Sequence, residues 1–469
     1  MTGPYDVAVI GAGSAGCVVA SRLVRAGARV ALVEAGPDYG RFSERWPRDI
    51  RDPRRRTGRH DWGFQAETVS GMVAEEPRAR VVGGCSAHNE CAAVWPPQED
   101  LDAWELPGWS ANDLWPLVQG IERASGGSTI RGRTGPLVTR QWRENELTTW
   151  QSAFIESALA EGYGQLDDAS AASPDSGVAA FHANIKRDVR WNAAFAFLDP
   201  VRGRRGLDIH ARTEARRLVS RAQRAVTLVC RRDHRQIEIR ADRYVVSCGT
   251  FGSPLLLLRS GIRSRELGRG LQDHPGVALT FRPRRGAPSG LRSRNPFRSQ
   301  VVLRAASGTT RFGWDLHVVP YQAEGEILIF VFFMAPRSRG VVALRGDSPR
   351  IQFRFFVDQG RADLDALEAG VGLARQIASR CAFVETTDPA PGVRGRALRR
   401  WIRTNVSGYA HAAGTCRMGT DVASVVDPAC RLRDFDNVRV ADASIAPQIP
   451  RANTNLLCML IGARAAEMM

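Results

Sequence analysis

Long apolar runs are missing from this 469-residue sequence, and so are closely paired cysteines. No apolar run reaches the roughly eighteen residues needed to cross a bilayer, and no basic leader with a cleavage site precedes the first apolar strand. The nine cysteines include no C-x-x-C pair, which argues against a disulfide framework and a structural zinc site. These absences predict a cytoplasmic protein with reduced thiols, no membrane span and no metal.

Lysine is almost absent as well. Lys186 is the single lysine, and the formal charge of +16 comes from arginines spread along the chain. A spread charge suits a compositional bias of the genome at least as well as a polyanion site, and no nucleic-acid module is recognisable. We therefore expect no nucleic-acid partner, while a basic nucleic-acid-binding or scaffold protein remains the alternative from a different class.

The first stretch, residues 5–36, combines an apolar strand, a glycine-rich turn and a helix. The turn has G-x-G-x-x-G spacing, which brings free backbone amides and the positive end of the helix dipole against a pyrophosphate. Glu34 ends a second strand, where its carboxylate can bind both ribose hydroxyls and would repel a 2′-phosphate. The stretch predicts dinucleotide binding and does not by itself distinguish FAD from NAD. The expected contacts are Gly11, Gly13, Ser14, Ala15, Gly16, Glu34 and Ala35.

A second glycine-rich segment begins at Gly83-Gly84 and continues with small residues through Ser86. Such backbone can approach a flat ligand closely. The segment, GGCSAHNEC, resembles the first signature motif of the glucose-methanol-choline (GMC) oxidoreductases, which are FAD enzymes that oxidise alcohols, and is most similar to the choline oxidase-like members. The resemblance implies that His88 is bonded covalently to the flavin 8α-methyl and that Asn89 contacts the flavin. Noncovalent FAD, with His88 only packed near the ring, is the alternative.

The middle of the chain continues the resemblance. Residues 243–262 match the second GMC motif, and Ser253-Pro254 predicts a helix start there. Cofactor contacts are expected at Ala215 and Gly249. Residues 267–275 resemble the family's GxxLQDHP element, in which we interpret His274 as structural; they follow Ile262 directly, where the family has a further strand and loop.

The last stretch carries the chemistry. Residues 409–419 resemble the HxxGTxxMG motif of the family, and residues 437–455 resemble its closing motif. The resemblance implies that His411 is the acid/base at flavin N5 and that Asn453 is the second catalytic residue. Hydride removal from an alcohol carbon needs a base of near-neutral pKa for the hydroxyl proton and a donor that holds the alkoxide. The implied cofactor contacts are Asp442, Ala443, Asn453, Thr454 and Asn455.

The resemblance covers the whole chain and implies an α/β fold, with a Rossmann-type FAD-binding domain and an inserted antiparallel-sheet substrate domain. Residues 1–140, 187–276 and 408–469 are assigned to the first, and residues 141–186 and 277–407 to the second. Within the second, alternating patterns predict strands over 300–304, 314–319, 327–333 and 351–357, and a helix over 363–379.

The implied function is oxidation of a small-molecule alcohol to an aldehyde or ketone, with electrons passed from FAD to oxygen or to a separate acceptor. The sequence shows no obvious aromatic cage and no anionic residue placed like the choline-binding glutamate of the family, which argues against choline as the substrate. A lyase of the flavin-containing hydroxynitrile type is the alternative on the same scaffold. The compact, arginine-rich chain also resembles the actinobacterial branch associated with the redox cofactor mycofactocin. The role of Glu90, which replaces a small residue, and the oligomeric state stay open.

Overall fold

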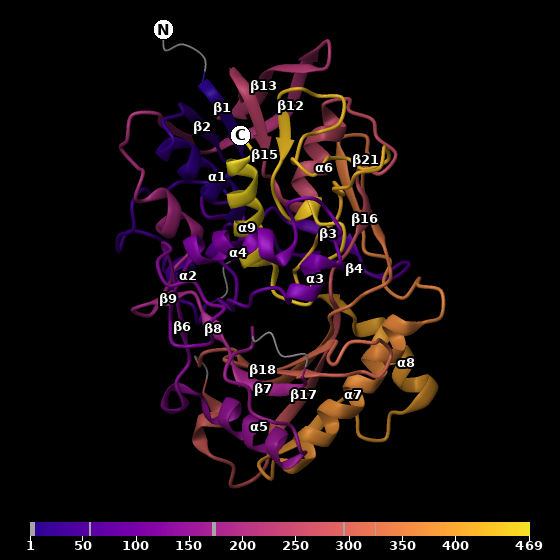
Figure 1. The fold of residues 1–469 in the computed structure, drawn as a ribbon. Coiled ribbons are helices and arrows are strands. Elements are labelled where there is room, and N and C mark those ends of the chain that lie inside the picture. The colour runs from indigo at the N-terminus through magenta and orange to yellow at the C-terminus, as the bar shows by residue number, and fades with distance from the viewer. Residues whose placement is uncertain (1–4, 56–57, 171–174, 294–295, 324) are drawn as a thin grey trace.

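The computed structural model describes residues 5–55, 58–170, 175–293, 296–323 and 325–469. Figure 1 shows two regions, one above the other: a parallel sheet with the first and last helices, and a large antiparallel sheet with helices on its outer side. None of the helices in the described part of the chain has the length and apolarity that a membrane crossing requires. All nine cysteines are free thiols.

The five-stranded parallel sheet carries the first glycine turn on its central strand. β1 and β2 are apolar and almost wholly buried, as expected for parallel strands covered on both faces. The helix that follows β1, α1 (Ser14–Arg25), packs against the last helix, α9 (Thr454–Glu467). The chain termini therefore build one layer together. The strand order is β11 (Leu207–His210), β2 (Val30–Val33), β1 (Tyr5–Ile10), β15 (Ala241–Val246) and β25 (Val438–Val440).

Helix α6 (Gly249–Arg259) follows β15 and lies beside an antiparallel sheet of three strands. The sequence predicts its start at Ser253-Pro254, which is wrong, because the helix already begins at Gly249. Pro254 has no N–H for the helical bond to the Thr250 carbonyl. That carbonyl instead accepts a hydrogen bond of 2.6 Å from the Thr415 hydroxyl, so the proline is tolerated inside the helix. The three strands are β12 (Thr213–Arg221), β13 (Arg224–Arg232) and β14 (Arg235–Ile239).

A seven-stranded antiparallel sheet forms the second region (Figure 1). Helices α5 (Thr149–Ala160) and α7 (Ala362–Arg380) pack on it, and α8 (Gly395–Asn405) packs on α7. The predicted helix over 363–379 is confirmed by α7. The strands are β23 (Val384–Asp388), β17 (Pro275–Pro283), β20 (Glu326–Phe333), β19 (Leu316–Ala323), β18 (Val301–Ala305) and β7 (Gly177–Ala180), with β24 (Ser407–Gly408) beside β17.

A mixed sheet of five strands contains segments from both predicted domains and connects the two regions. The strand predicted over 351–357 ends early, at Gln352, because Arg354 and Phe356 have positive φ angles of 55° and 63° that break an extended chain. The strands in order are β16 (Arg269–Leu271), β21 (Gly340–Arg345), β22 (Ser348–Gln352), β3 (Phe64–Glu67) and β4 (Val73–Glu76).

Shorter elements fill the space between the sheets. The helices are α2 (Arg48–Arg51), α3 (Gln98–Asp102) and α4 (Ala111–Ile121), and the 3₁₀ turn after the second glycine motif is η1 (Gly84–Ala87). The remaining short strands are β5 (Glu122–Ser125), β6 (Leu137–Gln141), β8 (His182–Ala183), β9 (Ile185–Lys186) and β10 (Val189–Arg190).

Candidate active site

A cavity of about 520 Å³ opens at the carboxyl edge of the parallel sheet. Its wall is formed by the first glycine turn, the end of β2, η1, the start of α6 and the start of α9. Sequence motifs that lie far apart in the chain therefore share one cavity. The predicted cofactor contacts in its wall are Gly11, Gly13, Ser14, Ala15, Glu34, Ala35, Gly84, Ala215, Gly249, Asp442, Ala443 and Thr454.

The two glycine motifs meet backbone to backbone at this cavity. Gly84 has a φ of +54°, and a Cβ on it would lie 2.5 Å from the Gly13 Cα. The Gly83 amide donates to the Ala12 carbonyl at 2.8 Å, which fixes the two loops together. No side chain caps the start of α1, so its first amides point to the cavity without a capping partner. This is a cradle of backbone donors for an anionic group.

Gly16 serves the turn and does not line the cavity. A Cβ at this position would lie 1.9 Å from the Gly11 carbonyl oxygen, so only glycine lets α1 start this close to β1. Gly11 itself has a φ of +100°, and a Cβ on it would lie 2.3 Å from the Ser247 carbonyl oxygen. Both residues therefore shape the turn, while Gly13 keeps the space in front of it open.

Two buried carboxylates stand at strand ends in the wall. Glu34 accepts backbone hydrogen bonds from Ala12 at 3.0 Å and Gly36 at 2.7 Å, and burial raises its pKa to about 7. Asp442 accepts from the Gly249 amide at 2.9 Å and from the Ser253 hydroxyl at 2.5 Å. Burial raises the pKa of Asp442 as well. Asp442 thereby ties the start of α6 to the closing motif.

The start of α9 supplies a further donor. The Ser14 hydroxyl donates to Asn455 Oδ1 at 2.8 Å, which connects the first and last motifs. Asn455 Nδ2 is buried and has no hydrogen-bond partner among the described residues. A buried amide donor without a partner is costly, so a ligand oxygen at this place would satisfy it.

A cluster of imidazole and aromatic rings adjoins the cavity. Ala410 and Ala412 line the cavity, and the buried His411 lies between them in sequence. Its Nε2 is 3.2 Å from Asn453 Nδ2, and its Nδ1 is 3.0 Å from His274 Nδ1. The structure therefore brings the two predicted catalytic residues together and adds a second histidine to them.

Aromatic rings close this cluster. Tyr409 stacks on Phe332 with ring centroids 3.5 Å apart, and its ring centroid is 4.1 Å from that of His411. His317 is buried and stacks on Trp314 at 5.4 Å. The rings keep bulk water away from the imidazoles, which lowers the local dielectric and strengthens the electrostatic interactions there.

The proton positions on the paired imidazoles follow from their partners. Burial lowers the pKa of His411 well below its usual value, with His274 and His317 adding to the effect, and burial lowers the pKa of His274 to about 3. Both rings are therefore neutral near pH 7, and one proton lies between their Nδ1 atoms. The atom of Asn453 that faces His411 is the amide nitrogen Nδ2, which is a donor, so His411 Nε2 is the acceptor. His411 then carries its proton on Nδ1, donates it to His274, and has an unprotonated, basic nitrogen at Nε2 that accepts from Asn453.

Asp273 holds the loop that carries these rings. Its Oδ1 accepts hydrogen bonds from the backbone amides of His274 at 2.7 Å, His411 at 3.1 Å and Tyr409 at 3.2 Å. Burial raises the pKa of Asp273 to about 7. One carboxylate therefore sets the positions of three ring-bearing residues.

The segment around His88 follows η1, and His88 is not part of the cavity wall. Ser86 is buried, donates to the Gly83 carbonyl at 2.6 Å and accepts from the Ala193 amide at 2.9 Å, so its hydroxyl is used within the protein. Asn89 Oδ1 accepts from the Cys91 amide at 3.1 Å in a tight turn. Burial lowers the pKa of His88 to about 4.

Three residues near the site were not assigned a functional role from the sequence. Interpreting His274 as structural missed its contact with His411, because nothing local to residues 267–275 indicates a partner so far along the chain. Arg78 lines the cavity, forms an ion pair of 2.7 Å with Glu76, and no motif marks it. Glu90 pairs with Arg298 at 2.9 Å, which gives this unexplained carboxylate a partner.

Comparison with known proteins decides the family. The GMC oxidoreductase models match residues 5–276 and residues 336–462. The chain is 30% identical to choline oxidase from Arthrobacter globiformis, over 99% of this chain and 94% of that protein. The chain belongs to the GMC oxidoreductase family. The resemblance predicted from the sequence is therefore confirmed.

Other relatives agree with this assignment. The chain is 30% identical to an oxygen-dependent choline dehydrogenase of Sinorhizobium medicae (strain WSM419), over 98% of this chain and 95% of that protein. The crystal structure of pyridoxine 4-oxidase from Mesorbium loti superposes with a TM-score of 0.88 at 26% identity, covering 98% of both chains. A fungal aryl-alcohol oxidase, 18% identical with a TM-score of 0.82 and covering 100% of this chain and 99% of that one, shares the fold.

As a GMC protein the chain is an FAD-binding oxidoreductase, and the residues of the cavity fit that cofactor. The Gly13–Gly84 cradle would offer its backbone amides to a pyrophosphate, and Glu34 would offer its carboxylate to ribose hydroxyls. Asn455 Nδ2, which has no partner among the described residues, would be a donor for a further polar group of the cofactor.

The contact between the glycine motifs gives a first prediction. Gly84→Ala places a methyl group 2.5 Å from the Gly13 Cα, so one loop must move away from the cradle. We expect the purified variant to lose most of its bound flavin, measured as flavin absorbance per mole of protein. The matched control is Gly372→Ala in α7, where a Cβ meets nothing within 4 Å. Equal flavin content in the two variants would contradict the proposed cradle.

Proposed function

We propose that this enzyme oxidises an alcohol to an aldehyde or ketone, with His411 as the base and Asn453 as the group that holds the developing alkoxide. The observation that carries the proposal is the partly buried contact of 3.2 Å between Asn453 Nδ2 and His411 Nε2, next to the cavity of the cofactor motifs. FAD, when bound, supplies the acceptor for the hydride of the alcohol carbon.

The protein's part is to move one proton and to stabilise one charge. His411 Nε2, the unprotonated nitrogen, takes the hydroxyl proton of the alcohol as the hydroxyl replaces Asn453 Nδ2 beside it. The imidazolium that results still donates its Nδ1 proton to the lone pair of His274 Nδ1, 3.0 Å away. Asn453 Nδ2 is then released from Nε2 and donates to the alkoxide oxygen. Because Tyr409 and Phe332 shield this place, these interactions act in a low dielectric.

The surroundings favour an alcohol with an uncharged apolar or aromatic body. The Phe332 ring fills the space beside Gly276, where a Cβ would lie 2.1 Å from Phe332 Cδ1. Tyr409 and Trp314 add further ring surface, and Oδ1 of the buried Asp273 carboxylate is engaged by backbone amides. A cationic substrate such as choline would find among these groups only the carboxylate of Asp273, whose pKa burial raises to about 7. FAD held at the Gly13–Gly84 cradle would hand the electrons on to oxygen or to another acceptor.

The test is anaerobic flavin bleaching with a panel of aliphatic and aromatic alcohols. We expect bleaching, and we expect His411→Gln to slow it by roughly 10²- to 10⁴-fold while the flavin stays bound, because the variant loses the base and keeps the volume. The control is His234→Gln, whose side chain is exposed on the surface. A yellow protein that no alcohol bleaches, and that instead cleaves cyanohydrins, would make the enzyme a lyase.

The pH dependence follows from the electrostatics of His411. Its pKa lies well below 6.5 because the ring is buried among other imidazoles. The sequence argument expects a base near neutrality, whereas burial shifts it to more acidic values. A base works only unprotonated, so we expect the rate of flavin reduction to stay level as the pH falls to 6.5 and to decline only below it. A decline centred above pH 6.5 would show that His411 is not the titrating base.

Covalent attachment of FAD through His88 is a further expectation of this proposal. The pKa of His88 is lowered to about 4 by burial, so its ring is neutral and keeps the nitrogen lone pair that such a bond requires. We expect the yellow colour to stay with acid-precipitated protein and to wash out from His88→Ala. His60→Ala, which removes a partly buried imidazole outside the motifs, is the control. Colour that washes out of the unaltered protein would refute the bond.

A further inference from the structure

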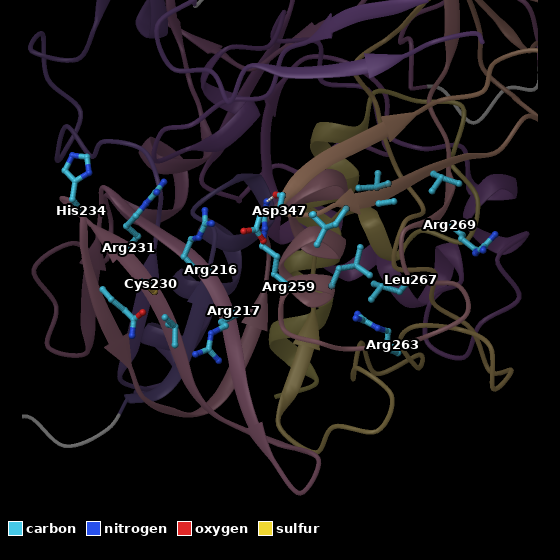
Figure 2. A pocket seen from close by; sticks show the side chains of 18 of the residues that line it. Arg216, Arg217, Cys230, Arg231, His234, Arg259, Arg263, Leu267, Arg269 and Asp347 are labelled. Atoms are coloured by element: carbon cyan, nitrogen blue, oxygen red, sulfur yellow. Dashed lines mark hydrogen bonds between the residues drawn. The ribbon is translucent and has the colours of Figure 1, made fainter. Parts of the chain in front are cut away.

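A second and larger hollow, of about 1040 Å³, lies on the outer side of α6. Its wall is formed by β12 and β13, by α6 and residues 260–268 after it, and by β21. Figure 2 shows arginine side chains reaching it from both sides, with Arg259 of α6 between them. His411 and Asn453 are not among its lining residues, so this hollow is separate from the proposed chemistry.

The hollow is strongly basic. Among its described lining residues are seven arginines and His234, and Asp347 is the single acidic one. Arg216 and Arg231 share one carboxylate, that of Glu214, at 2.6 and 2.8 Å. Four further arginines of the wall form no ion pair with any carboxylate in the described part of the chain, namely Arg217, Arg263, Arg269 and Arg354. Positive charge therefore exceeds its local counter-charge by several units.

Arg259 is an arginine of this wall that feels the excess of positive charge directly. Its guanidinium donates to the Asp347 carbonyl at 3.0 Å, while its Nε is buried without a partner among the described residues. Burial and the charge of Arg216 both lower its pKa. Like charges held together in a hollow repel each other, and an anion placed among them would relieve that repulsion.

The floor of the hollow is apolar. Leu258, Leu267 and Val342 contribute hydrocarbon surface between the arginines. Guanidinium groups match phosphate and carboxylate oxygens in a two-pronged geometry, and the volume is close to the upper end of small-ligand sites, about 300–1,000 Å³. We propose that this hollow binds a small molecule that carries several phosphate or carboxylate groups on an apolar body.

The ligand would lie behind the cofactor cavity without entering it. Arg259 lines both spaces, and β12 begins at Thr213 in the wall of the cofactor cavity and continues to Arg216 in the wall of the hollow. The proposal needs no alcohol oxidation and no electron transfer, so it is independent of the function proposed above.

The test uses the full-length protein with its flavin and the trisulfonated pyrene dye pyranine, which combines a flat apolar body with three anionic groups. Fluorescence anisotropy at low salt should show binding that weakens as salt is added. We expect Arg263→Ala/Arg269→Ala to weaken it by at least about tenfold, since each lost charge-assisted contact weakens binding severalfold. The control Arg396→Ala/Arg400→Ala removes equal charge from exposed positions of α8, which lies in the other region of the molecule (Figure 1).

The outcomes separate site binding from general attraction. Displacement of the dye by inorganic tripolyphosphate supports a phosphate-bearing ligand, and displacement by citrate supports a polycarboxylate. No binding at low salt, or equal weakening in the two double variants, overturns the proposal. The conservative double variant Arg263→Lys/Arg269→Lys retains charge without the forked geometry. It should bind the dye with an affinity between that of the unaltered protein and that of Arg263→Ala/Arg269→Ala. Thermal unfolding of every variant shows that each is folded.

Discussion

The buried contact between the rings of His274 and His411 is the constraint on which the rest of the site depends. The two residues are 137 positions apart, so no local preference brings them together. Strand pairing does: Pro275 of β17 lies opposite Gly408 of β24, and Gln272 bridges to Ala413 on the other side. Asp273 then ties both backbones to one carboxylate. A shift of one residue in this register would turn both rings away from each other.

Burial of these rings determines what they can do. Burying a neutral imidazole pair with a shared Nδ1 proton in a low dielectric costs less free energy than burying a charged pair. The pair can nevertheless take up one proton, because the charge created on His411 is met by the lone pair of His274. Asn453 contributes the complementary donor from the start of α9, the same helix that packs on α1 at the cofactor cradle. Proton acceptor and cofactor motifs are thus positioned through one helix.

The sequence predicts what is encoded locally. The glycine turn, the strand ends at Glu34 and Asp442, and helix α7 depend on short-range spacing and patterning, and each stands close to where the pattern puts it. Features that depend on distant partners were missed. The early start of α6 requires the Thr415 hydroxyl to satisfy the Thr250 carbonyl, and the end of β22 at Gln352 requires positive φ angles at two non-glycine residues. The pairing of His274 with His411 belongs to the same class.

The distribution of charge shows most clearly that features formed by distant residues cannot be predicted from local sequence. Along the chain the arginines are spread without a dense tail, which favours a compositional explanation. Folding changes their distribution, because β12, β13, α6 and the loop after β22 come together and concentrate guanidinium groups around one hollow. Even spacing in sequence therefore says little about even spacing in space when strands return antiparallel and bring residues of one face together. A basic composition becomes a specific electrostatic feature only where the fold gathers arginines over an apolar floor with too few carboxylates to neutralise them.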